Sequence, residues 1–211
     1  MCRLALPHPV RVGVTGRCAA GKSSLGDELE TAVRERGRAV LRASIDDFHR
    51  PGHKFRSMRE EWTPRTYYEE GYDYTAFRDV LLGPLGPGGS LRCRTGIFDS
   101  YHDEPIPEQW HRVPPDAVAI IDGAYILREE LEAHWDWIIW LDVDNETMVE
   151  RARQRDIAWV HDEDAVVRRY RERSIPSHEI YEDECRPREK AHAIVDNNRI
   201  AEPRLVSLAA R

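Results

Sequence analysis

Eight consecutive residues near the start of the chain decide the fold: Gly16-Arg17-Cys18-Ala19-Ala20-Gly21-Lys22-Ser23. They fit the pattern GxxxxGK[ST] at every fixed position. In such a loop the glycines allow backbone N–H groups to surround phosphate oxygens, the lysine reaches the β- and γ-phosphates, and the serine hydroxyl ligates Mg²⁺. The alternative is a glycine turn that binds nothing. The stretch predicts a nucleotide-binding site formed by Gly16, Arg17, Cys18, Ala19, Ala20, Gly21, Lys22, Ser23 and Ser24, in which Cys18 contributes its backbone and not its thiol.

The residues on both sides of this loop predict a strand before it and a helix after it. Residues 10–15 (VRVGVT) form a β-branched run, which is typical of a buried strand that enters a turn. From Leu25 to Val33 apolar residues recur at helical spacing, and Gly37 provides a helix stop. A second apolar run covers residues 39–45. This order of strand, helix and strand is the opening of a parallel α/β sheet.

The rest of the chain continues this alternation. We expect strands at 117–121, 137–143 and 193–195, the last before a short tail, and helices at 74–82, 127–134, 145–156, 162–173 and 177–184, with Asn145 as an N-cap. Residues 50–74 read as a surface excursion, and residues 91–98 as an edge strand or part of a hairpin. The predicted fold class is α/β, a three-layer P-loop NTPase fold with a mostly parallel sheet of about five strands flanked by helices.

The two interruptions of the alternation suggest how the chain is organised. We expect residues 1–211 to form a single domain of this class. Within it, residues 50–116 are expected to form a substrate-binding excursion with a flap. Residues 145–186 are expected to form an Arg-rich lid and the C-terminal helices.

Composition excludes several classes of protein. With 31 Lys and Arg against 38 Asp and Glu, the formal net charge is −7, which argues against non-specific nucleic-acid binding. No apolar run approaches the roughly 18 residues that span a bilayer, so we expect no membrane segment. The N-terminus lacks the apolar stretch of a signal peptide, so we expect a cytoplasmic protein, and homo-oligomerisation stays open. The four cysteines form no CxxC pair, which argues against a disulfide framework or a zinc site.

Motifs that would identify two other nucleotide-binding classes are missing. A GTPase reads guanine through Asn-Lys-x-Asp, whereas the lysines here follow Gly21, His53 and Glu189. A transport ATPase carries an LSGGQ-like signature, which the chain also lacks.

Acidic residues follow two of the expected strands. Asp46 and Asp47 end the second strand, and Asp122 follows the apolar pair Ile120-Ile121. We expect Asp46 to accept or orient the proton of an attacking hydroxyl, and Asp122 to hold the Mg²⁺ shell together with Ser23. The alternative for each aspartate is a turn-capping role.

Arginines cluster on the helix expected after residue 145. Arg151 and Arg155 lie four residues apart, so they share a helix face and are expected to close on the phosphates as a lid, with Lys22 as a further catalytic cation. Arg169 and Arg173 are further candidates for the same role. The alternative is a solvated face of salt bridges, because acidic residues are equally frequent in this part of the chain.

At these positions the chain resembles the uridine kinase and phosphoribulokinase family of P-loop small-molecule kinases. Asp46-Asp47-Phe48-His49 is similar to the family's Asp-Ser-Phe-Tyr motif, and Tyr72-Asp73 to its aromatic-Asp pair on the ribose. Phe98-Asp99 with His102 is similar to its nucleobase flap. Residues 150–156 resemble its Arg-rich lid helix, and residues 191–197 its closing strand. The resemblance implies that Asp46, His49, Tyr72, Asp73, Phe98 and His102 bind the acceptor, although Asp73 is also placed to start a helix.

Three departures from the family pattern bear on the acceptor. Ala158-Trp159-Val160-His161 stands where the family has a second arginine cluster, His49 replaces a tyrosine, and Asp122-Gly123 replaces Glu-Gly. The expected function is an ATP- and Mg²⁺-dependent kinase for a hydroxyl of a small, nucleoside-like metabolite, first of all the 5′-hydroxyl of a pyrimidine nucleoside. The alternatives are another acceptor, such as pantothenate, a sugar phosphate or a specialised nucleoside, and a nucleotide sensor without catalysis.

Overall fold

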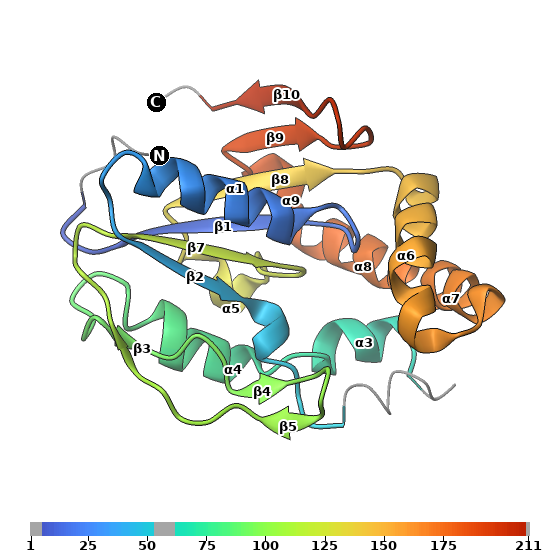
Figure 1. Ribbon diagram of the computed structural model, residues 1–211, viewed down its shortest axis with the longest axis horizontal. Helices are drawn as coiled ribbons and strands as arrows, with labels where there is room; N and C mark the ends of the chain where they lie inside the picture. Colours follow the sequence, from blue (N-terminus) through green and yellow to red (C-terminus); the bar gives the residue numbers. More distant parts are fainter. Residues whose placement is uncertain (1–5, 53–61, 210–211) are drawn as a thin grey trace.

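A six-stranded sheet forms the centre of the computed structural model, which describes residues 6–52 and 62–209 (Figure 1). Its strand order is β10-β9-β8-β1-β7-β2, and every neighbouring pair is parallel except β9 and β10. The strands are β1 (Val10–Gly16), β2 (Val40–Ser44), β7 (Val118–Gly123), β8 (Trp137–Asp142), β9 (Ala193–Asp196) and β10 (Arg204–Leu208). Strand β1 lies between two strands that come later in the chain, so the strand order reverses beside it.

Helices cover both faces of this sheet and extend past the carboxyl ends of its strands (Figure 1). They are α1 (Lys22–Arg34), α3 (Pro64–Glu70), α4 (Tyr74–Ala76), α5 (Glu129–Glu132), α6 (Asn145–Val160), α7 (Glu163–Arg169), α8 (Ile175–Cys185) and α9 (Pro187–Lys190). A 3₁₀ turn η1 (Ile45–Asp47) follows β2, and two π-helical segments, η2 (Phe77–Leu82) and η3 (Tyr170–Ser174), continue α4 and α7. None of the described helices is long and apolar enough to cross a membrane.

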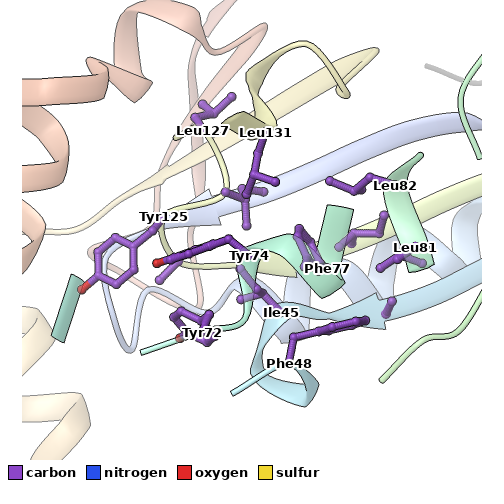
Figure 2. Packing of buried hydrophobic residues seen from close by; sticks show 14 of the residues in the cluster. Ile45, Phe48, Tyr72, Tyr74, Phe77, Leu81, Leu82, Tyr125, Leu127 and Leu131 are labelled. Carbon is purple, nitrogen blue, oxygen red and sulfur yellow. The ribbon is translucent and has the colours of Figure 1, made fainter. Parts of the chain in front are cut away.

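Alternating residues of the strands feed two hydrophobic cores. On β7, Val118 and Ile120 belong to the core shared with α1 and α6, whereas Ala119 and Ile121 belong to the core on the opposite face. The second core is rich in aromatic rings, and Figure 2 shows Phe48, Phe77 and the tyrosines gathered around it. The α/β fold and the mostly parallel, three-layer sheet predicted from the sequence are therefore confirmed.

The structure corrects several element boundaries. The stretch interpreted as a tail contains β10, an antiparallel edge strand that the sequence pattern did not predict because its side chains are exposed. Helix α6 continues to Val160, and its N-cap is Asp144, whose side chain accepts from the Thr147 N–H at 2.7 Å, not Asn145.

The excursion after β2 is also more ordered than predicted. It contains α3, which starts at Pro64 behind the capping residue Thr63, while residues 53–61 lie outside the described part of the chain. The expected edge strand over 91–98 is two short strands, β3 (Arg92–Cys93), paired with β6 (His111–Arg112), and β4 (Phe98–Asp99), paired with β5 (Glu104–Pro105).

Replacing Asp136 by alanine is expected to destabilise the fold strongly. Arg11 on β1 is only 4% exposed and donates from Nε and Nη2 to the two oxygens of Asp136, at 3.0 and 3.1 Å. Removing one partner of such a buried pair leaves an uncompensated charge and costs about 3–5 kcal/mol of unfolding free energy. Urea unfolding followed by circular dichroism measures the loss.

The matched control is Glu184→Ala, which removes a partner of Arg65 in a pair that is about half exposed on both sides. It is expected to move the urea midpoint only slightly. Equal midpoints for Asp136→Ala and the wild type would contradict a stabilising role of the buried pair.

Candidate active site

The phosphate-binding loop connects β1 to α1 at the point where the strand order reverses, which is where open α/β sheets bind ligands. Two glycines are required there. A Cβ on Gly16 would lie 2.3 Å from the carbonyl oxygen of Leu141 on β8, and Gly21 has a φ of 91°. Ala19, with a φ of 56°, also adopts the left-handed region, which is rare away from functional sites. The backbone N–H groups at the start of α1 therefore face the space above the sheet.

Side chains from α8 hold this loop in place. Arg17 donates from Nε and Nη2 to the two oxygens of Glu182, at 2.7 and 2.8 Å. One turn earlier, His178 accepts from the Cys18 N–H through Nε2, at 3.0 Å, and lies 3.2 Å from the Cys18 thiol. Burial raises the pKa of that thiol, which agrees with the expectation that Cys18 contributes its backbone. Lys22 Nζ donates to the Arg17 carbonyl at 2.9 Å.

Ser23 and Asp122 meet at the carboxyl ends of β1 and β7. The Ser23 hydroxyl donates to Asp122 Oδ2 at 2.8 Å. The other oxygen, Oδ1, lies 3.0 Å from Nη2 of Arg42, a residue of β2 that sequence analysis did not single out. Gly26 makes room for this arginine, because a Cβ there would lie 2.6 Å from Arg42 Nη2. The two residues expected to hold Mg²⁺ are thus in contact, and a cation already partners the carboxylate.

Asp46 projects from the turn after β2, next to two aromatic residues. The Tyr72 hydroxyl donates to Asp46 Oδ1 at 3.0 Å, and the Ser44 hydroxyl accepts from the Asp46 N–H at 3.2 Å. His49 Nδ1 lies 2.7 Å from the Asp46 carbonyl oxygen, so this nitrogen carries the proton and donates. Burial lowers the pKa of His49, and its ring packs 4.2 Å from that of Tyr72. These contacts fix the direction of the Asp46 side chain.

Two adjoining cavities lie above the phosphate loop. The larger, of about 520 Å³, is lined by the loop, Asp122 and Arg151. The smaller, of about 320 Å³, is lined by His49, Tyr67 and Tyr72 on one side. Four residues border both cavities, namely Ala19, Lys22, Asp46 and Arg155. The larger cavity suits the phosphates of a nucleotide, and the shared border is where a group would pass between the two cavities.

The two predicted lid arginines both reach this region, with different contacts. Arg151 donates to the carbonyl oxygens of Asn197 and Asn198 at 2.6 and 3.2 Å, and lines the larger cavity. Arg155 donates to Asp156 and to the Tyr170 hydroxyl, both at 2.8 Å.

Three residues that the family resemblance assigns to the acceptor line neither of these two cavities. Asp73 Oδ1 accepts from the Ala76 N–H at 2.8 Å and caps α4, which is the helix-start role left open above. Phe98 is 5% exposed and belongs to β4. His102 is two-thirds exposed and hydrogen-bonds through Nδ1 to Asp99 at 2.6 Å. The structure therefore brings Asp46, His49 and Tyr72 to the lining of the smaller cavity, and not these three.

Other side chains at the site were not recognised in the sequence. They are Arg42, Tyr67, Tyr101, Asp156, Tyr170 and His178. Tyr67 comes from α3, in a segment without clean periodicity, and His178 reaches back 160 residues to the loop. The sequence carries no local signal for either contact, because both depend on how distant helices pack.

No cluster of three or more His, Cys, Asp or Glu side chains able to hold a metal ion occurs in the part of the chain that the structure describes. A site made of one carboxylate, one hydroxyl and the oxygens of a bound phosphate suits Mg²⁺, which keeps few protein ligands. Ser23 and Asp122 fit such a site.

The arrangement is typical of one class of protein, the P-loop phosphotransferases. It combines a phosphate loop at the end of β1, acids at the ends of β2 and β7, and an arginine-bearing helix above them. No protein-family model matches the chain. Uridine-cytidine kinase B of Dictyostelium discoideum is 25% identical over 154 residues, which cover 72% of this chain and 60% of that protein. This chain thus spans less than two thirds of that relative.

Two solved structures share the fold. A candidate fructose transport system kinase from Silicibacter sp. TM1040 matches with a TM-score of 0.70 and 26% identity, over 87% of this chain and 90% of that one. A possible uridine kinase from Bacillus stearothermophilus matches with a TM-score of 0.67 and 18% identity, over 91% of both chains. The chain is thus similar in sequence and fold to P-loop kinases of the uridine kinase and phosphoribulokinase-like group, and the similarity supports an ATP-dependent small-molecule kinase.

Asp47→Asn is expected to stabilise the protein at neutral pH. Burial and the charges of Asp46, Asp99 and Asp122 raise the pKa of Asp47 to about 6. A carboxyl group whose pKa is higher in the folded than in the unfolded protein stabilises the fold at pH values below its unfolded pKa, which is near 4. This contribution to the free energy of unfolding is lost as the pH rises through 6. The urea midpoint of the variant should exceed that of the wild type at pH 7.5, and the difference should vanish at pH 4. The carboxylate is only partly buried and the residue as a whole is exposed, so solvent screening keeps the effect small.

The control for this prediction is Asp103→Asn, an aspartate outside the group of four acids that accepts a hydrogen bond from the Gly52 N–H. It should show no gain at pH 7.5. A midpoint difference between Asp47→Asn and the wild type that stays constant between pH 4 and 7.5 would contradict the raised pKa.

Proposed function

We propose that the protein transfers the γ-phosphoryl group of ATP to a hydroxyl of a small acceptor bound in the smaller cavity. The observation that carries this proposal is the shared border of the two cavities, where Lys22 and Arg155 face Asp46. A donor in the larger cavity and an acceptor in the smaller one would meet there. The pairing of a phosphate loop with a carboxylate at the acceptor side is what phosphoryl transfer to an alcohol needs.

In the proposed reaction the acceptor oxygen forms a bond to the γ-phosphorus. The bond from that phosphorus to the β,γ-bridging oxygen breaks, and ADP leaves with the electron pair. Asp46 receives or orients the proton of the hydroxyl through Oδ2, because Tyr72 holds Oδ1. Lys22 and Arg155 lower the cost of charge on the transferring group. None of these steps requires a covalent intermediate on the protein.

Mg²⁺ would be held by Ser23 and Asp122 together with phosphate oxygens, and when bound it neutralises phosphate charge. The hydroxyl and the carboxylate already lie 2.8 Å apart, so both oxygens are placed on one side of the loop. Arg42 would remain on the far oxygen of Asp122 and keep the carboxylate turned toward Ser23.

The acceptor expected from the sequence is a pyrimidine nucleoside, and the relative named for uridine and cytidine supports testing it first. Tyr72, His49 and Tyr101 give the cavity flat surfaces on which a base can stack. Pantothenate, sugar phosphates and specialised nucleosides are the other acceptors to compare. A sensor without catalysis is the remaining alternative, and it would bind ATP without turning over any acceptor.

Asp46→Asn is expected to lower kcat by about 10²–10⁴-fold, because the amide cannot take the proton of the acceptor hydroxyl. Binding of ATP, measured by titration calorimetry, should stay within a few-fold of the wild type, since Asp46 faces the acceptor. Turnover is followed as ADP release with MgATP and a panel of hydroxyl compounds. Asp47→Asn, one residue away, serves as the control and should keep most of the activity.

A folded wild type that binds ATP and turns over no acceptor would contradict the proposed kinase and favour the sensor. If Asp46→Asn turns over the acceptor at the wild-type rate, the kinase function remains supported, but the proposed role of Asp46 as the proton acceptor is contradicted. The two failures are therefore distinguishable.

Arg42→Met is expected to make the protein more dependent on MgATP for stability. Asp122 is 2% exposed, so loss of its cation leaves a buried carboxylate uncompensated and lowers the Tm without ligand. MgATP would supply the missing positive charge, so it should raise the Tm of the variant by more than that of the wild type. Differential scanning calorimetry with and without MgATP checks this. The control is Arg78→Met, which removes the partner of Asp79 in a surface ion pair. An equal rise of the Tm on addition of MgATP for Arg42→Met and the wild type would contradict the proposed metal site.

A further inference from the structure

The smaller cavity has a strongly basic wall. Three guanidinium groups line it, from Arg155 on α6, Arg169 at the end of α7 and Arg173 in η3. Among the described lining residues the cationic side chains are Lys22, Arg155, Arg169 and Arg173, and the carboxylates are Asp46 and Asp156. His49 adds no charge at neutral pH, because burial lowers its pKa.

Arg169 and Arg173 are separated from the place of the donor. The larger cavity, which contains the phosphate loop, is lined by Lys22, Arg151 and Arg155, and by neither of these two arginines. The phosphates of ATP therefore have their own cations. Arg169 and Arg173 face the compartment in which Asp46 would receive the acceptor hydroxyl.

Both arginines are held in position by their neighbours. Arg169 Nη2 donates to Asp156 Oδ2 at 2.6 Å, and the same oxygen accepts from the Tyr170 hydroxyl at 3.0 Å. Arg173 lies with its guanidinium carbon 4.6 Å from the centre of the Tyr67 ring, a cation–π contact. Guanidinium groups fixed in this way lose little conformational entropy when a ligand binds.

The position of Arg173 is electrostatically unfavourable in the unliganded protein. Burial lowers its pKa, and the like charge of Arg169 adds to this effect. A cation in such surroundings is stabilised by an anion that enters the same cavity. Three of the six residues that the family resemblance assigns to a nucleoside line neither cavity: Asp73 caps a helix, Phe98 belongs to β4 and His102 is exposed.

We propose that the acceptor carries an anionic group, a carboxylate or a phosphate ester, that binds Arg169 and Arg173 while its hydroxyl faces Asp46. This inference rests on the proposed kinase function and narrows its substrate class. The planar fork of arginine suits either anion, because it donates two parallel hydrogen bonds. The same cations reduce the repulsion between a negatively charged acceptor and the γ-phosphate.

The first experiment measures anion binding with the donor site filled. The wild type is saturated with Mg²⁺ and the non-hydrolysable analogue AMP-PNP, and inorganic phosphate is titrated by calorimetry. We expect saturable binding of one phosphate per chain, weakened about 10- to 100-fold in Arg173→Met, the loss typical of a charged hydrogen-bond partner. Arg173→Lys should recover part of it. Arg171→Met, two residues away in the same segment and 59% exposed, is the matched control and should bind phosphate as the wild type does.

A wild type that binds no phosphate under these conditions overturns the proposal whether or not the variants fold. Unchanged phosphate affinity in Arg173→Met also overturns it. A Kd for AMP-PNP that rises in Arg173→Met while phosphate binding stays constant would assign the residue to the donor and overturn it as well.

The second experiment compares acceptors that differ in charge. The pairs are fructose 1-phosphate and fructose, gluconate and glucose, and pantothenate and pantothenol, with uridine and cytidine alongside. We expect the anionic member to have the higher kcat/KM in every active pair, and Arg173→Met to raise its KM about 10- to 100-fold with little change in the KM of ATP. Comparison of the two carboxylate pairs with the phosphate pair distinguishes the two anions.

The outcomes separate this inference from the proposed function. Turnover restricted to uncharged acceptors overturns the anion site and leaves the kinase standing. Phosphate binding that depends on Arg173, together with no turnover of any acceptor, supports the anion site and contradicts the kinase.

Discussion

The whole site depends on how closely the backbone of the phosphate loop approaches its neighbours. At Gly16 there is no space for a Cβ between β1 and the carbonyl of Leu141, and at Gly21 a Cβ would lie 2.8 Å from Asn197 Nδ2. That amide donates to the Ala20 carbonyl at 2.7 Å, so β9 and β8 together set the height of the loop above the sheet. Lys22 and the first turn of α1 follow directly from this position. A side chain at either glycine would move the loop, and with it every group that faces the phosphates.

Around this loop the charges are divided into an acidic and a basic half. Asp46, Asp47, Asp99 and Asp122 are close enough that three of them help to raise the pKa of the fourth, Asp47, to about 6. Arg155, Arg169 and Arg173 line the smaller cavity, which Asp46 also borders. The four acids repel one another, and Arg173 is disfavoured by burial and by the charge of Arg169, whereas Arg155 and Arg169 are already paired with Asp156. A divalent cation with nucleotide phosphates on one side and an anionic acceptor on the other would relieve both costs at once, which makes phosphoryl transfer compatible with the stability of the fold.

The fold was predictable from the sequence because its signals are local, whereas much of the site depends on distant packing. The strands β1, β7 and β8 are rich in β-branched and other apolar residues, and the loop motif marks the turn between β1 and α1. The contact of Ser23 with Asp122 follows from parallel strands ending at the same edge. By contrast, Arg42 reaches Asp122 only because Gly26 leaves space on α1. Strand β10 has no buried face, so the hydrophobic pattern did not predict it. Asp73 caps a helix, which is one of the two roles that the sequence left open.

The arginines of the smaller cavity also explain a departure of the lid from the family pattern. Residues 158–161 lack the second arginine cluster that the resemblance predicts directly after the lid helix. Arg169 and Arg173 enter from the next helical segment, where α7 changes into the π-helical η3. A π-helical turn contains more residues than an α-helical turn. In this segment two neighbouring pairs, residues 169–170 and 173–174, line the cavity. If the smaller cavity holds the acceptor, as proposed, then this segment supplies two of the cations that face it, and an anionic acceptor is a physical reason for placing them there.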